Sequence, residues 1–118
     1  MVDVSQGDGG LGPGRGAAVL EVGPLTGRPG IRARGEISEI TRSPWEEALA
    51  GLARQHADVS YVELSEVAFV DVAGVAALAV TALGLSGGRV VVEHPPPQVP
   101  RVLSLFWPGL GRIEVAPR

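Results

Sequence analysis

The sequence predicts a single α/β domain in which a mixed β-sheet carries helices packed mainly on one side. Three observations lead to this class. Short β-branched or alternating segments are interleaved with longer segments whose apolar residues recur at helical spacing, and this alternation is typical of α/β folds. The length of 118 residues is that of one ordinary domain. The hydrophobic fraction of 45% is sufficient for a buried core.

The chain divides into an expected flexible tail over residues 1–16 and a folded domain over residues 17–118. The tail is rich in glycine and has no periodic pattern of apolar residues. Ordering it would cost backbone entropy without burying a core. The tail is therefore expected to contribute little to folding.

The domain begins with two predicted strands, over residues 17–22 and 31–37. Along the second segment, apolar or small residues alternate with charged ones. This period of two is typical of a strand with one buried face, and the Gly- and Pro-rich residues between the two segments favour a turn. The sequence thus predicts a half-buried hairpin.

A helix is predicted to begin at Ser43. Ser43 is the expected N-cap, Pro44 fits the first helical position, and Glu46 completes a capping box. The residues after it that recur at helical spacing are expected to face the core; they are Trp45, Leu49, Leu52, Ala53 and His56.

The next strand–helix unit has the clearest pattern. Residues 59–64 are predicted to form a strand, which residues 67–70 continue. Asp71 is the predicted N-cap of a helix over residues 72–85, because this uncharged segment is too long for an ordinary strand.

The C-terminal third predicts a strand, a helix and a final strand. Residues 89–93 (RVVVE) contain a continuous run of β-branched valines, as expected for a strand covered by helices. Residues 113–115 can add a last short strand, which makes the element order β-β-α-β-α-β-α-β. The residues between them that keep the spacing of a core-facing helix are Val99, Val102, Leu103 and Phe106.

Composition excludes several function classes. The formal net charge is −3 and all ten basic residues are arginines scattered along the chain, whereas nucleic-acid binding needs clustered bases. Cysteine is absent, so disulfides, thiol nucleophiles and Cys-rich zinc sites are excluded. The longest uncharged stretch, residues 72–88, is shorter than a membrane span of ~20 residues. A cytoplasmic protein without membrane insertion is expected.

No catalytic, metal or cofactor site is predicted. The glycine-rich residues 9–16 neither follow a strand nor open a helix, and no lysine is present to reach a phosphate. His56 and His94 have no second ligand at metal-binding spacing and are interpreted as surface histidines. No serine is flanked as a nucleophile. The sequence therefore favours a protein that is not an enzyme.

The helix after Asp71 is unusual because it has no polar face. Its residues expected to cover the sheet are Val75, Leu78, Ala82 and Leu85. The remainder, left for a second contact, are Ala73, Ala76, Ala77, Val80, Thr81 and Gly84. Neighbouring helices or a partner protein could cover this second face.

The segment YVELSEVAFVDVAG resembles the strand–turn–helix signature of STAS domains, the sulfate transporter and anti-sigma factor antagonist family. The usual signature is an apolar strand, a Leu-Ser pair, Phe-(Ile/Val)-Asp-Ser-Ser-Gly and a helix. GEISEITRSPWEEALAGL is similar to the family's second strand and first helix, and HPPPQVPRVLSLFWPGL resembles its Pro-rich entry into the last helix. The combination is most similar to actinobacterial STAS domains that accompany, or are fused to, methanogen/methylotroph-type sensory domains.

The resemblance includes one departure that bears on mechanism. In phosphorylated antagonists the residue after the motif Asp is the serine that a Bergerat-type anti-sigma kinase modifies; here Val72 stands in that place, followed by Ala73. The resemblance thus implies a degenerate, non-phosphorylatable site and a regulator that binds an anti-sigma factor, its kinase or a related protein. The residues expected to contact this partner are Val72, Ala73, Gly74, Ala76, Ala77 and Val80.

The alternative interpretation is a ligand-sensing or scaffold STAS module. It would use a cavity under the last helix, near Trp107, or self-association into a homodimer through the apolar helix. Rows of Ala and Val favour protein contact, whereas a sensor needs convergent polar groups in a pocket.

Overall fold

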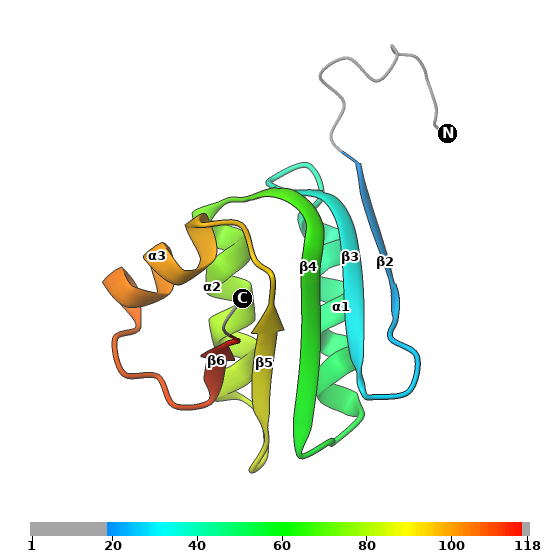
Figure 1. Cartoon of the computed structure of the whole chain (residues 1–118), viewed down its shortest axis with the longest axis vertical. Helices are drawn as coiled ribbons and strands as arrows, with labels where there is room; N and C mark the ends of the chain where they lie inside the picture. Colours follow the sequence, from blue (N-terminus) through cyan, green and yellow to red (C-terminus); the bar gives the residue numbers. More distant parts are fainter. Residues whose placement is uncertain (1–18, 117–118) are drawn as a thin grey trace.

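One five-stranded sheet organises the protein, with the strand order β2-β3-β4-β5-β6 (Figure 1). The structure is a computed structural model that describes residues 19–116. The strands are β2 (Leu20–Pro24), β3 (Gly30–Ile37), β4 (Val59–Val70), β5 (Arg89–Glu93) and β6 (Ile113–Val115). β2 pairs antiparallel with β3, and the pairs β3–β4, β4–β5 and β5–β6 are parallel. The predicted mixed sheet and element order are confirmed.

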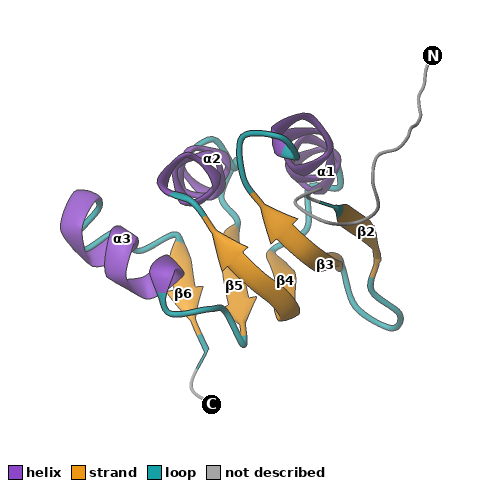
Figure 2. Ribbon diagram, turned by 90° about the horizontal axis from the view of Figure 1, so that it is seen from above, coloured by secondary structure: helices purple, strands orange, loops and turns teal. Residues whose placement is uncertain are grey.

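Three helices connect the parallel strands. They are α1 (Arg42–Arg54), α2 (Val72–Leu83) and α3 (Gln98–Phe106). Figure 2 shows α1 and α2 side by side on one face of the sheet, with α3 beyond α2 at the β6 end. The fold is therefore the predicted α/β domain with helices mainly on one side.

The hydrophobic core lies between the sheet and the helices. In each strand that faces the core, alternate residues point toward the helices because successive side chains of a strand lie on opposite faces. Each helix contributes one apolar stripe. The buried helical residues are Trp45, Leu49 and Leu52 of α1, Val75, Leu78, Ala79 and Ala82 of α2, and Val99, Val102 and Leu103 of α3.

The sheet face opposite the helices carries charged side chains that pair with one another. Ion pairs join Arg34 to Glu66 at 2.7 Å and Arg89 to Glu114 at 2.7 Å, in both cases between neighbouring strands. Opposite charges on adjacent strands stabilise a sheet modestly. This open face is therefore a solvated surface whose charges are balanced locally.

The beginning of α1 differs from the prediction. The helix begins at Arg42 with Thr41 as the N-cap, so Ser43 lies in the first turn and forms no cap. The Thr41 hydroxyl instead donates to the Glu36 carbonyl (2.8 Å) and accepts from the Ser38 N–H (2.9 Å). Thr41 thereby ties the loop after β3 together, and the helix starts two residues earlier than predicted.

Further details of the elements differ from the prediction. The segments predicted separately, 59–64 and 67–70, form one strand, β4, because bulges in its pairing with β3 absorb the intervening residues. Phe106 and His56 were predicted to face the core, but Phe106 is 60% exposed, since α3 ends there, and His56 is exposed beyond the end of α1. The helix predicted over residues 72–85 ends at Leu83, with Gly84 as its C-cap. The first strand occupies β2 and not residues 17–22, of which 17 and 18 lie outside the described residues, as does the predicted tail.

Candidate functional site

The site predicted from the sequence lies at the edge of the sheet where β3, β4 and β5 end. These strands are parallel, so their carboxyl ends share one edge, and α1, α2 and α3 all begin there (Figure 1). Such edges commonly carry the binding sites of α/β folds, because loops and helix N-termini converge on them. The first turn of α2 lies at this edge.

Asp71 holds the first turn of α2 in place. It is the N-cap, as predicted, and its Oδ1 accepts a hydrogen bond from the Gly74 N–H at 2.7 Å. The Asp71 N–H donates to the Ile37 carbonyl at 2.9 Å, which links the α2 start to the end of β3. Arg42 Nη2 lies 3.9 Å from Asp71 Oδ2. The carboxylate therefore has a structural role at the helix N-terminus.

Gly74 and Trp45 fix this turn against the core. A Cβ on Gly74 would lie 2.6 Å from Ile37 Cγ2 and 3.0 Å from Val70 Cγ1, so only glycine allows α2 to approach β3 this closely. The buried Trp45 indole N–H donates to the Gly74 carbonyl at 3.0 Å. α1 and the start of α2 are thus joined by a buried hydrogen bond as well as by packing.

The outer side of the same turn presents apolar side chains to solvent. Val72, the first residue of α2, is 54% exposed. Phe69 at the end of β4 is 40% exposed, and Ile40 in the loop before α1 is 73% exposed. We call Ile40, Phe69 and Val72 the apolar edge. No hydroxyl stands at residues 72 or 73.

The exposed apolar surface continues along α2. Val80 and Leu83 are 63% and 51% exposed, and Ala73, Ala76 and Ala77 are half-buried. Gly74, by contrast, is buried and cannot contribute to a partner surface, which removes it from the predicted contact set. α1 and α3 pack beside α2 and cover part of its second face. The part that remains open is an apolar stripe from Val72 to Leu83.

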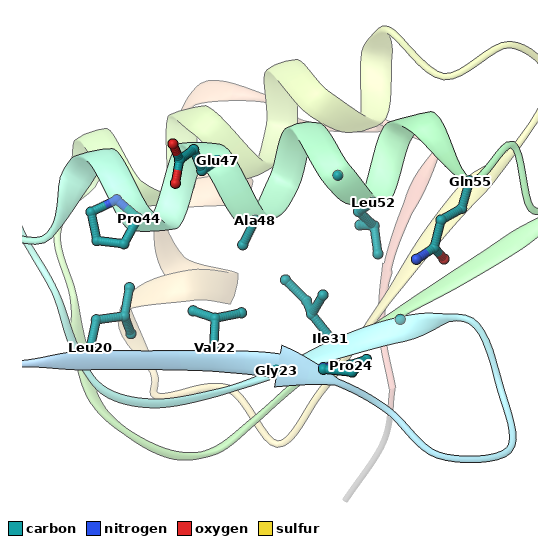
Figure 3. Close-up of a pocket in the computed structure, with 12 residues that line it drawn as sticks. Leu20, Val22, Gly23, Pro24, Ile31, Pro44, Glu47, Ala48, Leu52 and Gln55 are labelled. Carbon is teal, nitrogen blue, oxygen red and sulfur yellow. The ribbon is translucent and has the colours of Figure 1, made fainter.

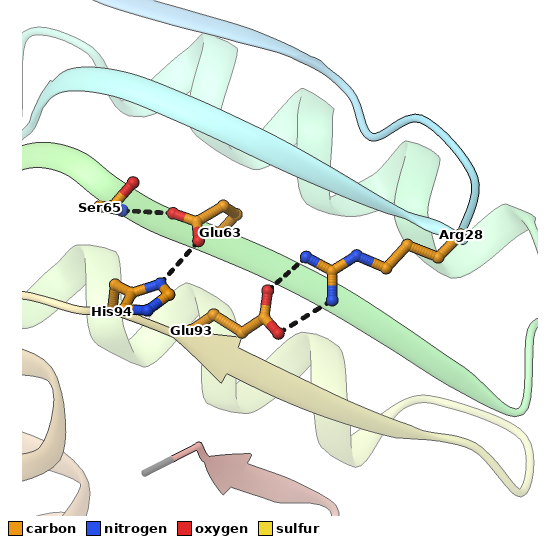
Figure 4. A network of polar contacts seen from close by, with 5 residues as sticks. All are labelled: Arg28, Glu63, Ser65, Glu93 and His94. Carbon is orange, nitrogen blue, oxygen red and sulfur yellow. Dashed lines mark hydrogen bonds and ion pairs between the residues drawn. The ribbon is translucent and has the colours of Figure 1, made fainter. Parts of the chain in front are cut away.

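A polar network lies on the open face of the sheet, where β4 and β5 run side by side (Figure 4). His94 Nδ1 lies 2.7 Å from Glu63 Oε2, and Glu63 Oε1 accepts from the Ser65 N–H at 2.6 Å. Arg28 donates two hydrogen bonds to Glu93, at 2.9 and 2.5 Å, and its guanidinium lies 4.4 Å from the Tyr61 ring centre.

Glu63 is the residue of this network whose ionisation is most altered. Burial raises the pKa of its carboxyl, but hydrogen bonds from Ser65 and His94 together outweigh that effect and the pKa lies below its ordinary value. The sequence pattern gives no sign of the His94–Glu63 contact, because the two residues are 31 positions apart. Only the pairing of β4 with β5, in which Glu63 lies opposite Glu93, brings them together.

Within residues 19–116, no group of three or more His, Cys, Asp or Glu side chains is placed to hold a metal ion. In the same part of the chain, no helix combines the length and apolar character needed to cross a membrane.

The fold and this strand–turn–helix element define a STAS-type domain. A family model described as "Mlab, STAS domain" matches residues 25–110, and the chain belongs to this family. No match was found among curated proteins.

Solved structures of anti-sigma factor antagonists are similar to this chain. An anti-sigma factor antagonist from Mycobacterium paratuberculosis is 25% identical, with a TM-score of 0.58 over 75% of this chain and 77% of that one. The anti-sigma factor antagonist SpoIIAA, in its unphosphorylated form, is 20% identical, with a TM-score of 0.56 over 86% of this chain and 90% of that one. At 20% identity, the similarity to SpoIIAA is a similarity of fold alone.

Proposed function

We propose that this protein is a regulatory STAS module that binds an anti-sigma factor, its Bergerat-type kinase or a related regulator in the cytoplasm. The contact is made by the first turn of α2 and the apolar stripe that follows it. The STAS family and the likeness to anti-sigma factor antagonists support a regulatory, protein-binding role in transcription over an enzymatic one. Because fold alone does not define function, the proposal depends on the site.

The observation that carries the proposal is the exposure of the Val72 side chain at the start of α2. This side chain is about half exposed on a turn that Asp71, Gly74 and Trp45 hold rigidly. Phe69, at the end of β4, is also exposed. A preformed apolar surface of this kind fits the desolvated centre of a protein interface.

Binding is proposed to be independent of phosphorylation of this chain. A kinase that recognises the α2 start finds Val72 and Ala73 there, and neither has an oxygen that can attack a phosphate. The regulator would therefore remain in its binding form, because no phosphate can add charge to the interface.

The test uses the kinase that co-purifies with this chain when the immobilised chain is incubated with cytosol of its source cells. The chain is incubated with that kinase and ATP, and its intact mass is measured. We expect no phosphate on the wild-type chain, whereas Val72→Ser restores the hydroxyl at the helix N-terminus and is expected to accept one. A wild-type chain that gains the mass of a phosphate on any hydroxyl would contradict the proposal.

The sensor alternative has one structural feature in its favour. A groove of about 460 Å³ lies next to Trp107, at the place where that interpretation put a cavity. Its lining includes Leu103, Leu110 and Val115, with Ser104 as a polar side chain. Ligand pockets usually combine an apolar wall with several placed polar groups, so this groove supports sensing less well than the α2 surface supports protein binding.

A further inference from the structure

A second surface lies at the β2 edge of the sheet, between α1 and the edge strand β2 (Figure 3). It is a groove of about 540 Å³, open to solvent along the sheet edge. Small residues of α1, Ala48 and Gly51, leave the space open, and the strand side is apolar. The strand side of its lining includes Leu20, Val22 and Ile31, and the helix side includes Pro44, Glu47 and Ala48.

The strand beside this groove presents backbone groups outward. The Glu36 N–H donates to the Val19 carbonyl and the Leu25 N–H to the Gly30 carbonyl. Hydrogen-bonded residue pairs alternate along an antiparallel ladder. These two bonds and the β2–β3 register therefore place the backbone N–H and C=O groups of Glu21 and Gly23 toward β3. The backbone of Leu20 and Val22 therefore points to the outer edge, where no partner is found among the described residues.

The side chains of the same two residues point into the groove. Figure 3 shows both side chains directed toward α1, Leu20 opposite Pro44 and Val22 opposite Ala48. An added strand would place every second side chain over this apolar floor, because side chains alternate between the two faces of a sheet. The edge and the groove thus match the two periodic features of one extended chain: its backbone hydrogen bonds and its alternate side chains.

We propose that the β2 edge and the α1–β2 groove bind an extended segment of a partner protein by strand addition. This inference concerns a surface separate from the α2 site and does not depend on the proposed function. In strand addition, main-chain hydrogen bonds contribute affinity and pockets for alternate side chains contribute specificity. The bound partner segment carries apolar side chains at positions i and i+2, which lie on the same face of the added strand.

Charge complementarity selects the chemistry of the partner. Glu47 is the one charged side chain among the groove's lining residues, so a basic residue next to the apolar positions completes the match. A second copy of this chain fits less well, since pairing two β2 edges would bring another Glu47, and no positive charge, to the groove. The structure thus assigns to the groove an apolar and basic extended segment.

The test is selection of random heptapeptides displayed on phage against the immobilised full chain. We expect enriched sequences with apolar residues at alternate positions and at least one Lys or Arg. A synthetic peptide of the enriched sequence is expected to shift the backbone amide resonances of Leu20 and Val22 in NMR spectra of the full chain.

Two variants separate strand addition from other binding. Val22→Pro removes an outward N–H while leaving the β2–β3 bonds intact, and it is expected to weaken the peptide at least about tenfold, the equivalent of one lost hydrogen bond. Val22→Ala keeps the N–H and is the matched control. Ala48→Phe fills the groove from α1 and is expected to abolish binding without touching β2. Thermal unfolding confirms that each variant folds.

Three results would overturn the proposal. The first is a selection that enriches no alternating sequence. The second is a peptide that binds Val22→Pro as tightly as Val22→Ala. The third is concentration-dependent self-association that Val22→Pro removes, which would make a second copy the occupant.

Discussion

The outward face of α2 and the open face of the sheet are both exposed to solvent, but they differ in charge. α2 has no charged residue from Val72 to Leu83, and its outer stripe exposes Val72, Val80 and Leu83. On the open face of the sheet, arginines and a histidine face carboxylates on neighbouring segments.

The difference supports the proposal that the α2 face is the one that binds a partner. On the open face, Arg28, Arg34, Arg89 and His94 each have a carboxylate partner within this chain. Exposed pairs of this kind contribute little to binding or stability. Exposed apolar side chains have no such partner, and removing them from water is favourable by about 25 cal/mol per Å². A partner protein therefore gains most by covering α2 and the apolar edge.

The largest expected effect concerns the anchor beneath the α2 site. Trp45→Ala removes a large buried side chain and its hydrogen bond to the Gly74 carbonyl, and should lower the free energy of unfolding by about 3–5 kcal/mol. Urea denaturation measures this change. Trp45→Phe, which keeps most of the volume but not the N–H, should cost less. Equal losses for both variants would mean that the ring's volume does not support the turn.

The second effect is a pH dependence on the open face. The pKa of Glu63 is lower in the folded chain than its ordinary value, so the unfolded chain binds more protons at acid pH. The stability that Glu63 contributes is fully present above the ordinary carboxyl pKa of about 4.3 and is lost as the pH falls through the folded value. Glu63→Gln should therefore lose less stability than the wild type between neutral and strongly acidic pH.

Denaturant unfolding at a series of pH values compares the two chains, and Glu46→Gln, on the exposed surface of α1, is the matched control. A Glu63→Gln profile parallel to that of the wild type would show that the Ser65 and His94 contacts do not favour the ionised carboxylate.

The smallest effect is expected at an exposed ion pair. Arg89 and Glu114 lie 2.7 Å apart with about half of each side chain exposed. Arg89→Gln should lower the free energy of unfolding by only about 0.2–1 kcal/mol, and salt should reduce the difference. A larger, salt-independent loss would contradict the description of this face as a solvated surface.

Local sequence patterns predicted the elements that local interactions define. Residues 89–93 and 113–115 form strands as expected, and Asp71 caps α2 because an N-cap acts within one turn. The predicted start of α1 was wrong because the Thr41 hydroxyl forms hydrogen bonds with the Glu36 and Ser38 backbone and fixes the preceding loop. Ser43 had the same capping chemistry available, and only the loop geometry decides between them.

The contacts that define the surfaces could not be predicted. The Arg28–Glu93 and His94–Glu63 pairs join residues 65 and 31 positions apart, and they depend on strand order and register. The burial of Gly74 depends on how closely α2 approaches Ile37. Likewise, the α1–β2 groove arises from two elements whose separate patterns show only apolar faces.

The central claim is that the first turn of α2 is a binding surface and not part of the core. Val72→Asp tests it most directly, with Val72→Ala as the uncharged control. Thermal unfolding and affinity for the co-purified anti-sigma factor or kinase are measured for all three chains. A carboxylate at a helix N-terminus stabilises it by about 0.3–1 kcal/mol when solvated, so folding should be retained.

At a desolvated apolar interface the same carboxylate would lack a counter-ion, at a cost of ~2–5 kcal/mol of binding free energy. We therefore expect Val72→Asp to bind roughly thirty-fold to several-thousand-fold more weakly than Val72→Ala, at an unchanged unfolding midpoint. Equal affinity of the two variants would show that the turn is not the contact surface, and unfolding of Val72→Asp would place Val72 in the core.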